Sequence, residues 1–375
     1  MMGLVLDTRP MDGELVAAVP GVPAGYEIRM EPVGPDRFRL RGGPMNGAVV
    51  NFVRSESGEV TAVRAGTFEL AKVPPEKAAD LPVTARLTAP ASELTPEKET
   101  AFAALLARLM ERRDGGWVGY DLPYPKHEFV QFLMAQDLFI FHGSNNLEIE
   151  TFAPVRKSME MFDASGRGNL QAVYGTHDGL WSMFFAVVDR PRLRGSIRNG
   201  VMDFQNRAGE RLSVYNFSIN QDQLPEKPWC EGALYLLPRD TFVRTKLTEE
   251  TYANEWVSEQ AVRPVAKLRL QPEDFPFLAQ IGGHDDSALI RSGELGRAIR
   301  SAALNAALAG DTFTVRLPAE MGAQLEEYVE FQRTITPAAT YTLSTTEGAL
   351  VLEIASLPPA VRQLLSEEYK DLLEG

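Results

Sequence analysis

Cysteine and histidine are scarce in this chain of 375 residues. It contains one cysteine, Cys230, and four histidines, at positions 127, 142, 177 and 284. A single cysteine forms neither an internal disulfide nor a cysteine-based zinc site, and no two histidines have the HxH or HExxH spacing that brings two ligands onto one face. The sequence therefore predicts a protein of a reducing compartment without a metal site.

Long apolar runs are also absent. No stretch of about 18 uncharged apolar residues occurs, and residues 1–14 lack the apolar segment of a signal peptide. We therefore expect a cytoplasmic protein with no membrane partner.

Positive charge is deficient as well. Lys and Arg number 38 and Asp and Glu number 51, a net charge of −13, which repels phosphate backbones. Bulk binding of nucleic acid is therefore not expected, apart from one arginine-rich region that holds Arg190, Arg192, Arg194, Arg198, Arg207 and Arg211. This region is either a solvated loop or a patch for a diphosphate or a nucleic-acid end.

The chain is long enough for two or three domains, and its composition changes twice. Residues 1–94 predict a β-rich module, with Ser57-Gly58 placed to turn a hairpin. Thr95-Pro96 predicts the start of a helix that leads into a central region over 95–275. Residues 276–375 predict a separate α+β domain, beginning with a helix from Asp286 to Leu308 that Gly310 closes. We therefore expect an α+β protein of three parts.

The central region carries an ordered series of residues suited to ligand chemistry. A strand over 138–141 delivers His142, Gly143 and Ser144, and the missing side chain of Gly143 lets a ligand approach the backbone. A second strand ends at Tyr174, after which Asp178 caps a helix that carries Phe185. GxSxG, GxxxxGKS/T and GxGxxG motifs are absent.

An acidic segment that enters a strand completes the series. Glu255 and Glu259 are four residues apart and lie on one face in either a strand or a helix. Each residue of the series also has an ordinary interpretation, His142 and Tyr174 as core residues and the two glutamates as solvated side chains.

The central region resembles the ADP-ribosyltransferase superfamily of the His-Tyr-Glu type. The resemblance lies in the order of three features, which are a strand with His-Gly-Ser, a strand with Tyr before a helix, and a late acidic strand. The resemblance covers about residues 115–275 and includes the segments "FHGS", "YGTHDGLWSMFFA" and "EWVSEQAVRP". It implies a central split β-sheet that binds NAD⁺ in an open cleft.

The resemblance also implies a role for each matching residue. His142 would bind the adenosine-side ribose hydroxyl, the Gly143 backbone would hold the nicotinamide carboxamide, and Ser144 would support that amide. Tyr174 would stack on the nicotinamide ring with Phe185 on its other face, and Thr176 would lie among the NAD-contacting residues. Glu259, ahead of Glu255, would be the catalytic carboxylate.

The implied activity is NAD⁺-dependent transfer of ADP-ribose to an unknown macromolecular acceptor, a protein or a nucleic acid, with release of nicotinamide. A carboxylate near the developing positive charge on the ribose suits this chemistry. Arginine is a poor candidate acceptor, because Val257 and Ala253 stand where a second acid would precede the glutamate. Two alternatives remain open, an inactive member of the fold that binds a ligand or a protein, and RNA 2′-phosphotransferase activity.

Overall fold

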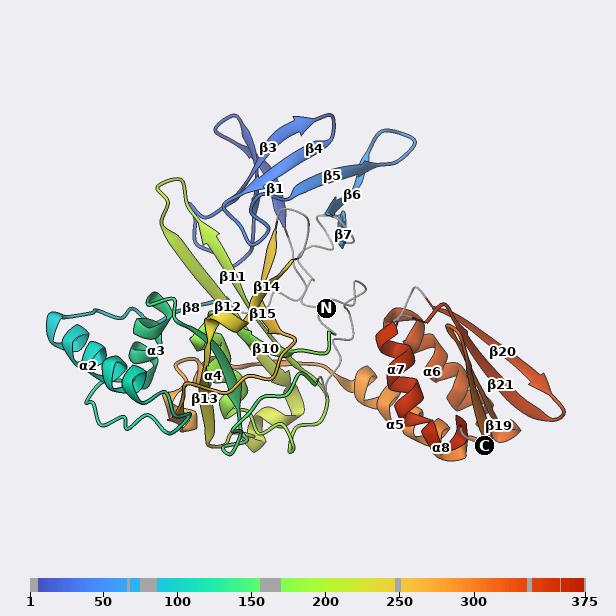
Figure 1. Ribbon diagram of the computed structural model, residues 1–375. Coiled ribbons are helices and arrows are strands. Elements are labelled where there is room, and N and C mark those ends of the chain that lie inside the picture. The colour runs from blue at the N-terminus through green and yellow to red at the C-terminus, as the bar shows by residue number, and fades with distance from the viewer. Residues whose placement is uncertain are drawn as a thin grey trace. The chain divides into compact units, whose positions relative to one another are not determined.

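The chain forms two compact units. The computed structural model describes residues 6–65, 68–74, 86–155, 170–246, 251–335, 339–357 and 359–373. One unit contains the described residues before 156 and those from Ala172 to His284, and the other contains those from Asp285 onward. The α+β class and the succession of β-rich, mixed and α+β regions are confirmed (Figure 1). No helix of these described ranges is long and apolar enough to cross a membrane.

A seven-stranded antiparallel sheet forms the N-terminal part of the first unit, and each strand pairs with the next along the chain. The predicted hairpin turn at Ser57-Gly58 is confirmed, since β5 and β6 flank it and Gly58 has a φ of +83°, which glycine adopts without steric cost. The strands are β1 (Asp7–Met11), β2 (Glu14–Ala18), β3 (Ile28–Gly34), β4 (Arg37–Arg41), β5 (Val49–Arg54), β6 (Val60–Ala65) and β7 (Phe68–Ala71).

The central region contains two sheets. Six antiparallel strands form the first, in the order β14-β15-β10-β9-β13-β16, and a long hairpin of two strands is the basis of the second (Figure 1). The first comprises β9 (Phe139–Ser144), β10 (Val173–Thr176), β13 (Gly232–Pro238), β14 (Val243–Lys246), β15 (Tyr252–Ser258) and β16 (Ala266–Leu270). The second comprises β11 (Ile197–Gln205), β12 (Arg211–Asn220), β8 (Leu87–Thr88) and β17 (Gly282–His284).

The tip of the β11–β12 hairpin joins the N-terminal sheet to the central region. The Gln205 N–H donates to the carbonyl oxygen of Gly42 at 2.8 Å. Phe204 and Val214 of the hairpin are buried in one apolar cluster with Ile28, Met30 and Leu40 of the N-terminal sheet. The two regions therefore share a core.

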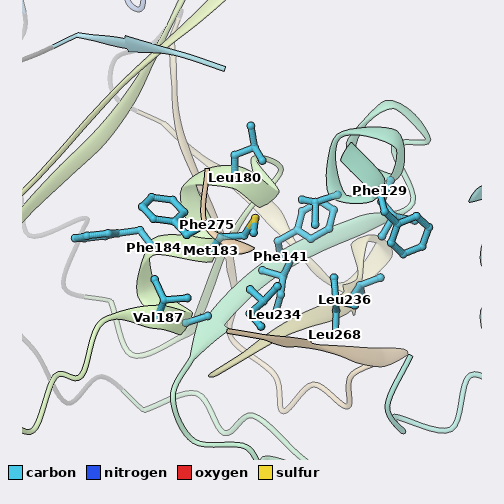
Figure 2. Packing of buried hydrophobic residues seen from close by; sticks show 14 of the residues in the cluster. Phe129, Phe141, Leu180, Met183, Phe184, Val187, Leu234, Leu236, Leu268 and Phe275 are labelled. Atoms are coloured by element: carbon cyan, nitrogen blue, oxygen red, sulfur yellow. The ribbon is translucent and has the colours of Figure 1, made fainter. Parts of the chain in front are cut away.

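Three helices pack with the central sheets. Helix α2 (Pro96–Arg112) begins after Thr95, as predicted, and the Thr95 hydroxyl accepts from the Lys98 N–H at 3.4 Å. Helices α3 (Lys126–Ala135) and α4 (Gly179–Val187) follow, and α4 begins after the predicted cap, Asp178. Figure 2 shows the core in which side chains of α3, α4, β9, β13 and β16 meet.

The second unit packs helices and a four-stranded antiparallel sheet, in the order β18-β19-β21-β20, around its own core. Strands β20 and β21 form a hairpin that turns at Glu347-Gly348. The elements are α5 (Ser287–Ala302), β18 (Asn305–Ala309), β19 (Thr312–Pro318), α6 (Gly322–Ile335), β20 (Thr340–Thr346), β21 (Ala349–Ala355), α7 (Pro359–Glu368) and α8 (Lys370–Leu373).

The predicted extent of the first helix in this unit is wrong. Helix α5 ends at Ala302, and the alanine-rich residues that follow form the edge strand β18. Gly310, with a φ of +62°, turns β18 into β19 and does not close a helix. Pairing with β19 outweighs the helix propensity of alanine, which is a weak preference that tertiary structure overrides.

Candidate functional site

Three neighbouring strands of the six-stranded sheet carry most of the predicted site residues. Strand β10, with Tyr174 and Thr176, pairs on one side with β9, which holds His142, and on the other side with β15, which holds Glu255. His142 and Glu255, which are 113 positions apart in the sequence, are thereby brought onto the two strands that flank β10.

Strand β9 is longer than predicted and separates from β10 along its second half. It continues through Ser144, so His142, Gly143 and Ser144 lie within the strand and not after its end. It pairs with β13 over six positions from Phe139 to Ser144, but with β10 only at Phe141 and Thr176. The sheet therefore opens between β9 and β10 beside His142.

His142 is fixed at this opening by one backbone contact. Its Nδ1 lies 2.7 Å from the carbonyl oxygen of Tyr174. Because a carbonyl only accepts, Nδ1 carries the hydrogen, which leaves Nε2 as the acceptor of the neutral ring. Burial lowers the pKa of His142, although the bond to Tyr174 acts in the opposite direction. The imidazole is therefore oriented and held toward its neutral form.

The side chains of His142 and Tyr174 lie on opposite faces of the sheet. His142 shares a face with Ile140, and its ring is edge-on to Phe152 with centroids 4.7 Å apart. Val173 belongs to the same buried cluster as Ile140, so Tyr174, the next residue, points to the other face. Only the backbone of Tyr174 reaches His142.

Tyr174, Thr176 and Glu255 share the face that α4 covers. The register places Thr176 opposite Glu255 and Tyr174 opposite Val257, so Tyr174 and Glu255 are diagonal neighbours. Thr176 is buried, and its hydroxyl oxygen accepts from the Asp178 N–H at 3.1 Å. The Thr176 hydroxyl thus has a role in the turn that leads into α4.

Gly143 and Ser144 also have partners within the chain. A Cβ on Gly143 would lie 1.9 Å from the carbonyl oxygen of Ser182 and 2.8 Å from the backbone nitrogen of Ala186, so helix α4 occupies the space beside this glycine. The Ser144 hydroxyl accepts from the Asn146 N–H at 3.1 Å. The sequence predicted that a ligand approaches the backbone at Gly143, and in the structure helix α4 lies there instead.

Glu259 lies outside the strands. It follows the end of β15 in a bend and is exposed, and β16 begins only at Ala266. The prediction that Glu259 enters a strand directly is therefore wrong, and Glu255 is the acid that lies within one.

Phe185 lies on α4 beside other aromatic residues. Its ring centroid is 5.8 Å from that of Phe184 and 6.2 Å from that of Trp181. The indole N–H of Trp181 donates to the side-chain oxygen of Asn199 on β11 at 2.7 Å. Phe185 is half-buried, and it is its neighbour Trp181 that contacts the second sheet.

A buried hydrogen bond between the carboxyl group of Asp178 and the hydroxyl of Tyr215, near this face, was not predicted from the sequence. Asp178 caps α4 through one carboxyl oxygen and accepts the Tyr215 hydroxyl on the other at 2.7 Å. Burial raises the pKa of Asp178 to about 6, against the lowering effect of hydrogen bonds from Trp181 and Tyr215. Burial also raises the pKa of Tyr215. The capping role was readable from the sequence, but no local pattern links Asp178 to a residue on β12.

The arginines of the arginine-rich region are spread along the β11–β12 hairpin and the segment that precedes it. Strand β11, about 27 Å long at about 3.4 Å per residue, lies between Arg194 and Arg207 in the chain. Three of these arginines form ion pairs, Arg192 with Asp189 at 3.7 Å, Arg194 with Asp222 at 2.8 Å and Arg207 with Glu14 at 2.7 Å. They do not form one continuous patch.

Two further features concern ligands. An open groove of about 1050 Å³ lies beside Lys126, Trp229 and Asp274, and none of the predicted site residues lines it. Within the part of the chain that the structure describes, no three His, Cys, Asp or Glu side chains gather in an arrangement able to hold a metal ion.

Comparison of the chain with protein-family models, with curated proteins and with solved structures finds no match. The function is therefore argued from the geometry of the three strands and their residues.

Proposed function

We propose that the first unit binds NAD⁺ at strands β9, β10 and β15 and transfers its ADP-ribosyl group to a macromolecular acceptor. The observation that carries this proposal is the strand order, in which the tyrosine strand lies between the histidine strand and the strand of the late acid. This order of three strands is similar to the split sheet that the sequence resemblance implies. Since the side chains of His142 and Glu255 lie on opposite faces of the sheet, NAD⁺ would contact both only through the opening between β9 and β10.

His142 is suited to bind a ribose hydroxyl. Its Nδ1–H is engaged by the Tyr174 carbonyl, so Nε2 is the acceptor for a hydroxyl donor. A neutral ring is required for this role, and burial favours the neutral ring. A ligand bound in the opening between β9 and β10 would make this hydrogen bond.

The proposed reaction breaks the bond between the ribose carbon and the nicotinamide nitrogen, and the electron pair leaves with nicotinamide. The ribose carbon gains positive charge, a nucleophilic atom of the acceptor forms the new bond to it, and that atom loses its proton. A carboxylate close to the ribose lowers the energy of this transition state. Because the charge exists mainly in the transition state, the carboxylate acts on the rate more than on binding.

We favour Glu255 over Glu259 for this carboxylate. Electrostatic stabilisation is effective when the charged group is held in place before the reaction. Glu255 is held within β15 as a diagonal neighbour of Tyr174, whereas Glu259 is exposed in a bend. This order reverses the preference that the sequence alone suggested.

A non-catalytic ligand-binding protein is the second candidate. It is favoured by the packing of α4 on Gly143 and by the internal hydrogen bonds of Ser144 and Thr176, which occupy groups that the resemblance assigns to nicotinamide binding. RNA 2′-phosphotransferase activity gains no such support, because the arginines that it requires are dispersed.

Calorimetric titration with NAD⁺ tests the binding step. We expect NAD⁺ to bind the full chain and His142→Ala to weaken binding by about 1–3 kcal/mol, through loss of a partly buried hydrogen bond. His127→Ala is the matched control, since His127 is half-buried on α3 and is not among the proposed site residues. Undetectable binding of NAD⁺ at millimolar concentration would contradict the proposed transfer of ADP-ribose.

Release of nicotinamide distinguishes the two candidates. Glu255→Gln should slow release by about 10²–10³-fold while leaving NAD⁺ affinity nearly unchanged. Glu259→Gln, measured in parallel, should retain most of the activity. Loss of activity in Glu259→Gln alone would restore the sequence-based order, and NAD⁺ binding without any nicotinamide release would favour the non-catalytic candidate.

A further inference from the structure

The outer face of the N-terminal sheet is rich in arginine, although the whole chain is acidic. Along β4, Phe38 and Leu40 face the core shared with β11 and β12, so Arg37, Arg39 and Arg41 occupy the opposite face. On β3, Arg29 lies between the core residues Ile28 and Met30 and is therefore on that opposite face as well. Strands β3 and β4 are neighbours (Figure 1).

The same face continues onto the flanking strands. Arg9 of β1 is opposite Val16 of β2, which is opposite Arg29. Arg37 is opposite Asn51 of β5, which is opposite Arg64 of β6. We call this surface the arginine face, and it comprises Arg9, Arg29, Arg37, Arg39, Arg41 and Arg64.

The arginine face is only half neutralised. Arg9, Arg41 and Arg64 form ion pairs with Asp7, Glu31 and Glu69, at 3.1, 3.0 and 2.5 Å respectively. The other three, Arg29, Arg37 and Arg39, form no ion pair with any residue that the structure describes. Arg37 is exposed, and Arg29 and Arg39 are half-buried.

The register adds an unfavourable contact to this surface. Arg29 stands directly opposite Arg41, and like charges directly opposite in an antiparallel pair are destabilising. Glu31 stands opposite Arg39, but its carboxylate binds Arg41 at 3.0 Å. A bound anion would relieve this repulsion, because it supplies the negative charge that the sheet lacks here.

From this geometry we propose that the arginine face binds the phosphate backbone of a single-stranded nucleic acid. The guanidinium group is a planar fork of donors that matches a phosphate, and every cation of this face is an arginine. The proposal does not depend on NAD⁺ chemistry, since it concerns a different sheet and a different ligand.

The form of the surface favours a single strand over other polyanions. A duplex is read by a helix or a hairpin inserted into a groove, and the arginine face is the outer side of a sheet without such a projection. A flexible strand can follow the face from strand to strand. A membrane surface is a poorer partner, because Val33 of β3 is the one exposed large apolar side chain on the described strands of this sheet and Val16 between the arginines is fully buried.

Fluorescence anisotropy with a labelled dT20 oligonucleotide tests the proposal on the full chain. The variant is the triple substitution Arg29→Gln, Arg37→Gln and Arg39→Gln, which breaks no ion pair of the described residues and removes the Arg29–Arg41 repulsion. The control is Arg108→Gln with Arg263→Gln, two exposed arginines elsewhere in the first unit that form no ion pair with described residues. Thermal unfolding of each variant verifies the fold.

We expect the intact chain to bind dT20 at low salt and the triple variant to bind it about tenfold or more weakly, with the control unchanged. The slope of log K against log salt should fall by about 2 in magnitude, at about 0.7 for each lost phosphate contact. Absence of binding by the intact chain would overturn the proposal, as would equal losses in the triple variant and the control. Binding to vesicles that contain phosphatidylserine without binding to dT20 would overturn it in favour of a membrane, and tighter binding to duplex DNA than to dT20 would overturn the assignment to a single strand.

Discussion

Asp178 is a buried acidic residue near the candidate site. Its carboxyl group is buried between the start of α4 and Tyr215 of β12, and burial is the main cause of its raised pKa. A raised carboxyl pKa means that the folded chain holds this proton more tightly than the unfolded chain does. The charged form therefore destabilises the fold, and the effect depends on pH.

We expect the contribution of Asp178 to stability to be fully present below about pH 4 and to be lost as the pH rises to about 6. Between these values the unfolded chain ionises at this residue and the folded chain does not, so the free energy of unfolding decreases with rising pH. With a pKa of about 6 in the folded chain against the ordinary aspartate pKa of 3.8, the loss is on the order of 3 kcal/mol. Urea unfolding of the wild type and of Asp178→Asn, measured from pH 4 to pH 7, gives this difference.

The variant Asp178→Asn retains a side-chain oxygen that can cap α4 but has no charge to titrate. The difference in unfolding free energy between variant and wild type should therefore grow in favour of the variant as the pH rises from 4 to 6. Tyr215→Phe is a second variant, and it should move the transition to higher pH because the Tyr215 hydroxyl stabilises the charged carboxylate. A difference that does not vary with pH would show that Asp178 titrates normally.

Helix α4 and strand β9 are in direct backbone contact, and glycine makes this contact possible. Gly143 on β9 and Gly232 on β13 both face α4 so closely that a Cβ on either would lie 1.9 Å from a helix carbonyl oxygen. The sequence alone suggested that Gly143 lacks a side chain so that a ligand can approach the backbone. The packing of α4 on this glycine accounts for it without any ligand.

We expect Gly143→Ala to lower the free energy of unfolding by about 3 kcal/mol or more, because the new methyl group meets backbone atoms that cannot rotate away. Gly119→Ala is the matched control, since no atom lies within 4 Å of its would-be Cβ, and its effect should be below about 1 kcal/mol. Urea unfolding of both variants measures the effects. Equal stability of the two would mean that α4 moves away from β9 at little cost.

Local patterns in the sequence predicted where helices begin better than they predicted where helices and strands end or which strands pair. The starts of α2 and α4 were predicted because Thr95 and Asp178 are caps, whose effect depends on the next few residues. The ends of β9 and α5 were not, because β9 is extended by pairing with β13 and α5 is cut short by the pairing of β18 with β19. The side-chain faces of His142 and Tyr174 depend likewise on pairing between distant strands.

For the binding of anions, the distribution of charge over the molecule matters more than the net charge. The net charge of −13 led to the expectation that nucleic acid is not bound outside the region of Arg190 to Arg211. Residues 276–375 contain 14 acidic and 7 basic residues, so part of the negative charge belongs to the C-terminal region. A charge sum over the whole chain therefore hides the arginine face, which appears only when the strands of the N-terminal sheet are aligned.

Each unit has a core of its own, and this leads to a prediction about their stability. Leu317 of β19 is fully buried in the core of the second unit, which includes Phe313, Leu325 and Leu352. Leu317→Ala should destabilise this unit by about 2–5 kcal/mol, through lost apolar burial and the cavity that remains. Hydrogen exchange measured by mass spectrometry should then show faster exchange in α5, α6 and β19–β21 and unchanged exchange in β9, β13 and α4.

Leu343→Ala is the control for this experiment, because Leu343 lies in the same unit on β20 but is 37% exposed. Its effect should be within about 0.5 kcal/mol, as for most surface substitutions. If Leu317→Ala accelerated exchange equally in the central sheet, the two units would unfold as one cooperative system. Separate responses would instead mean that a defect in the second unit leaves the strands of the candidate site folded. The proposed release of nicotinamide could then be assayed in the presence of such a defect.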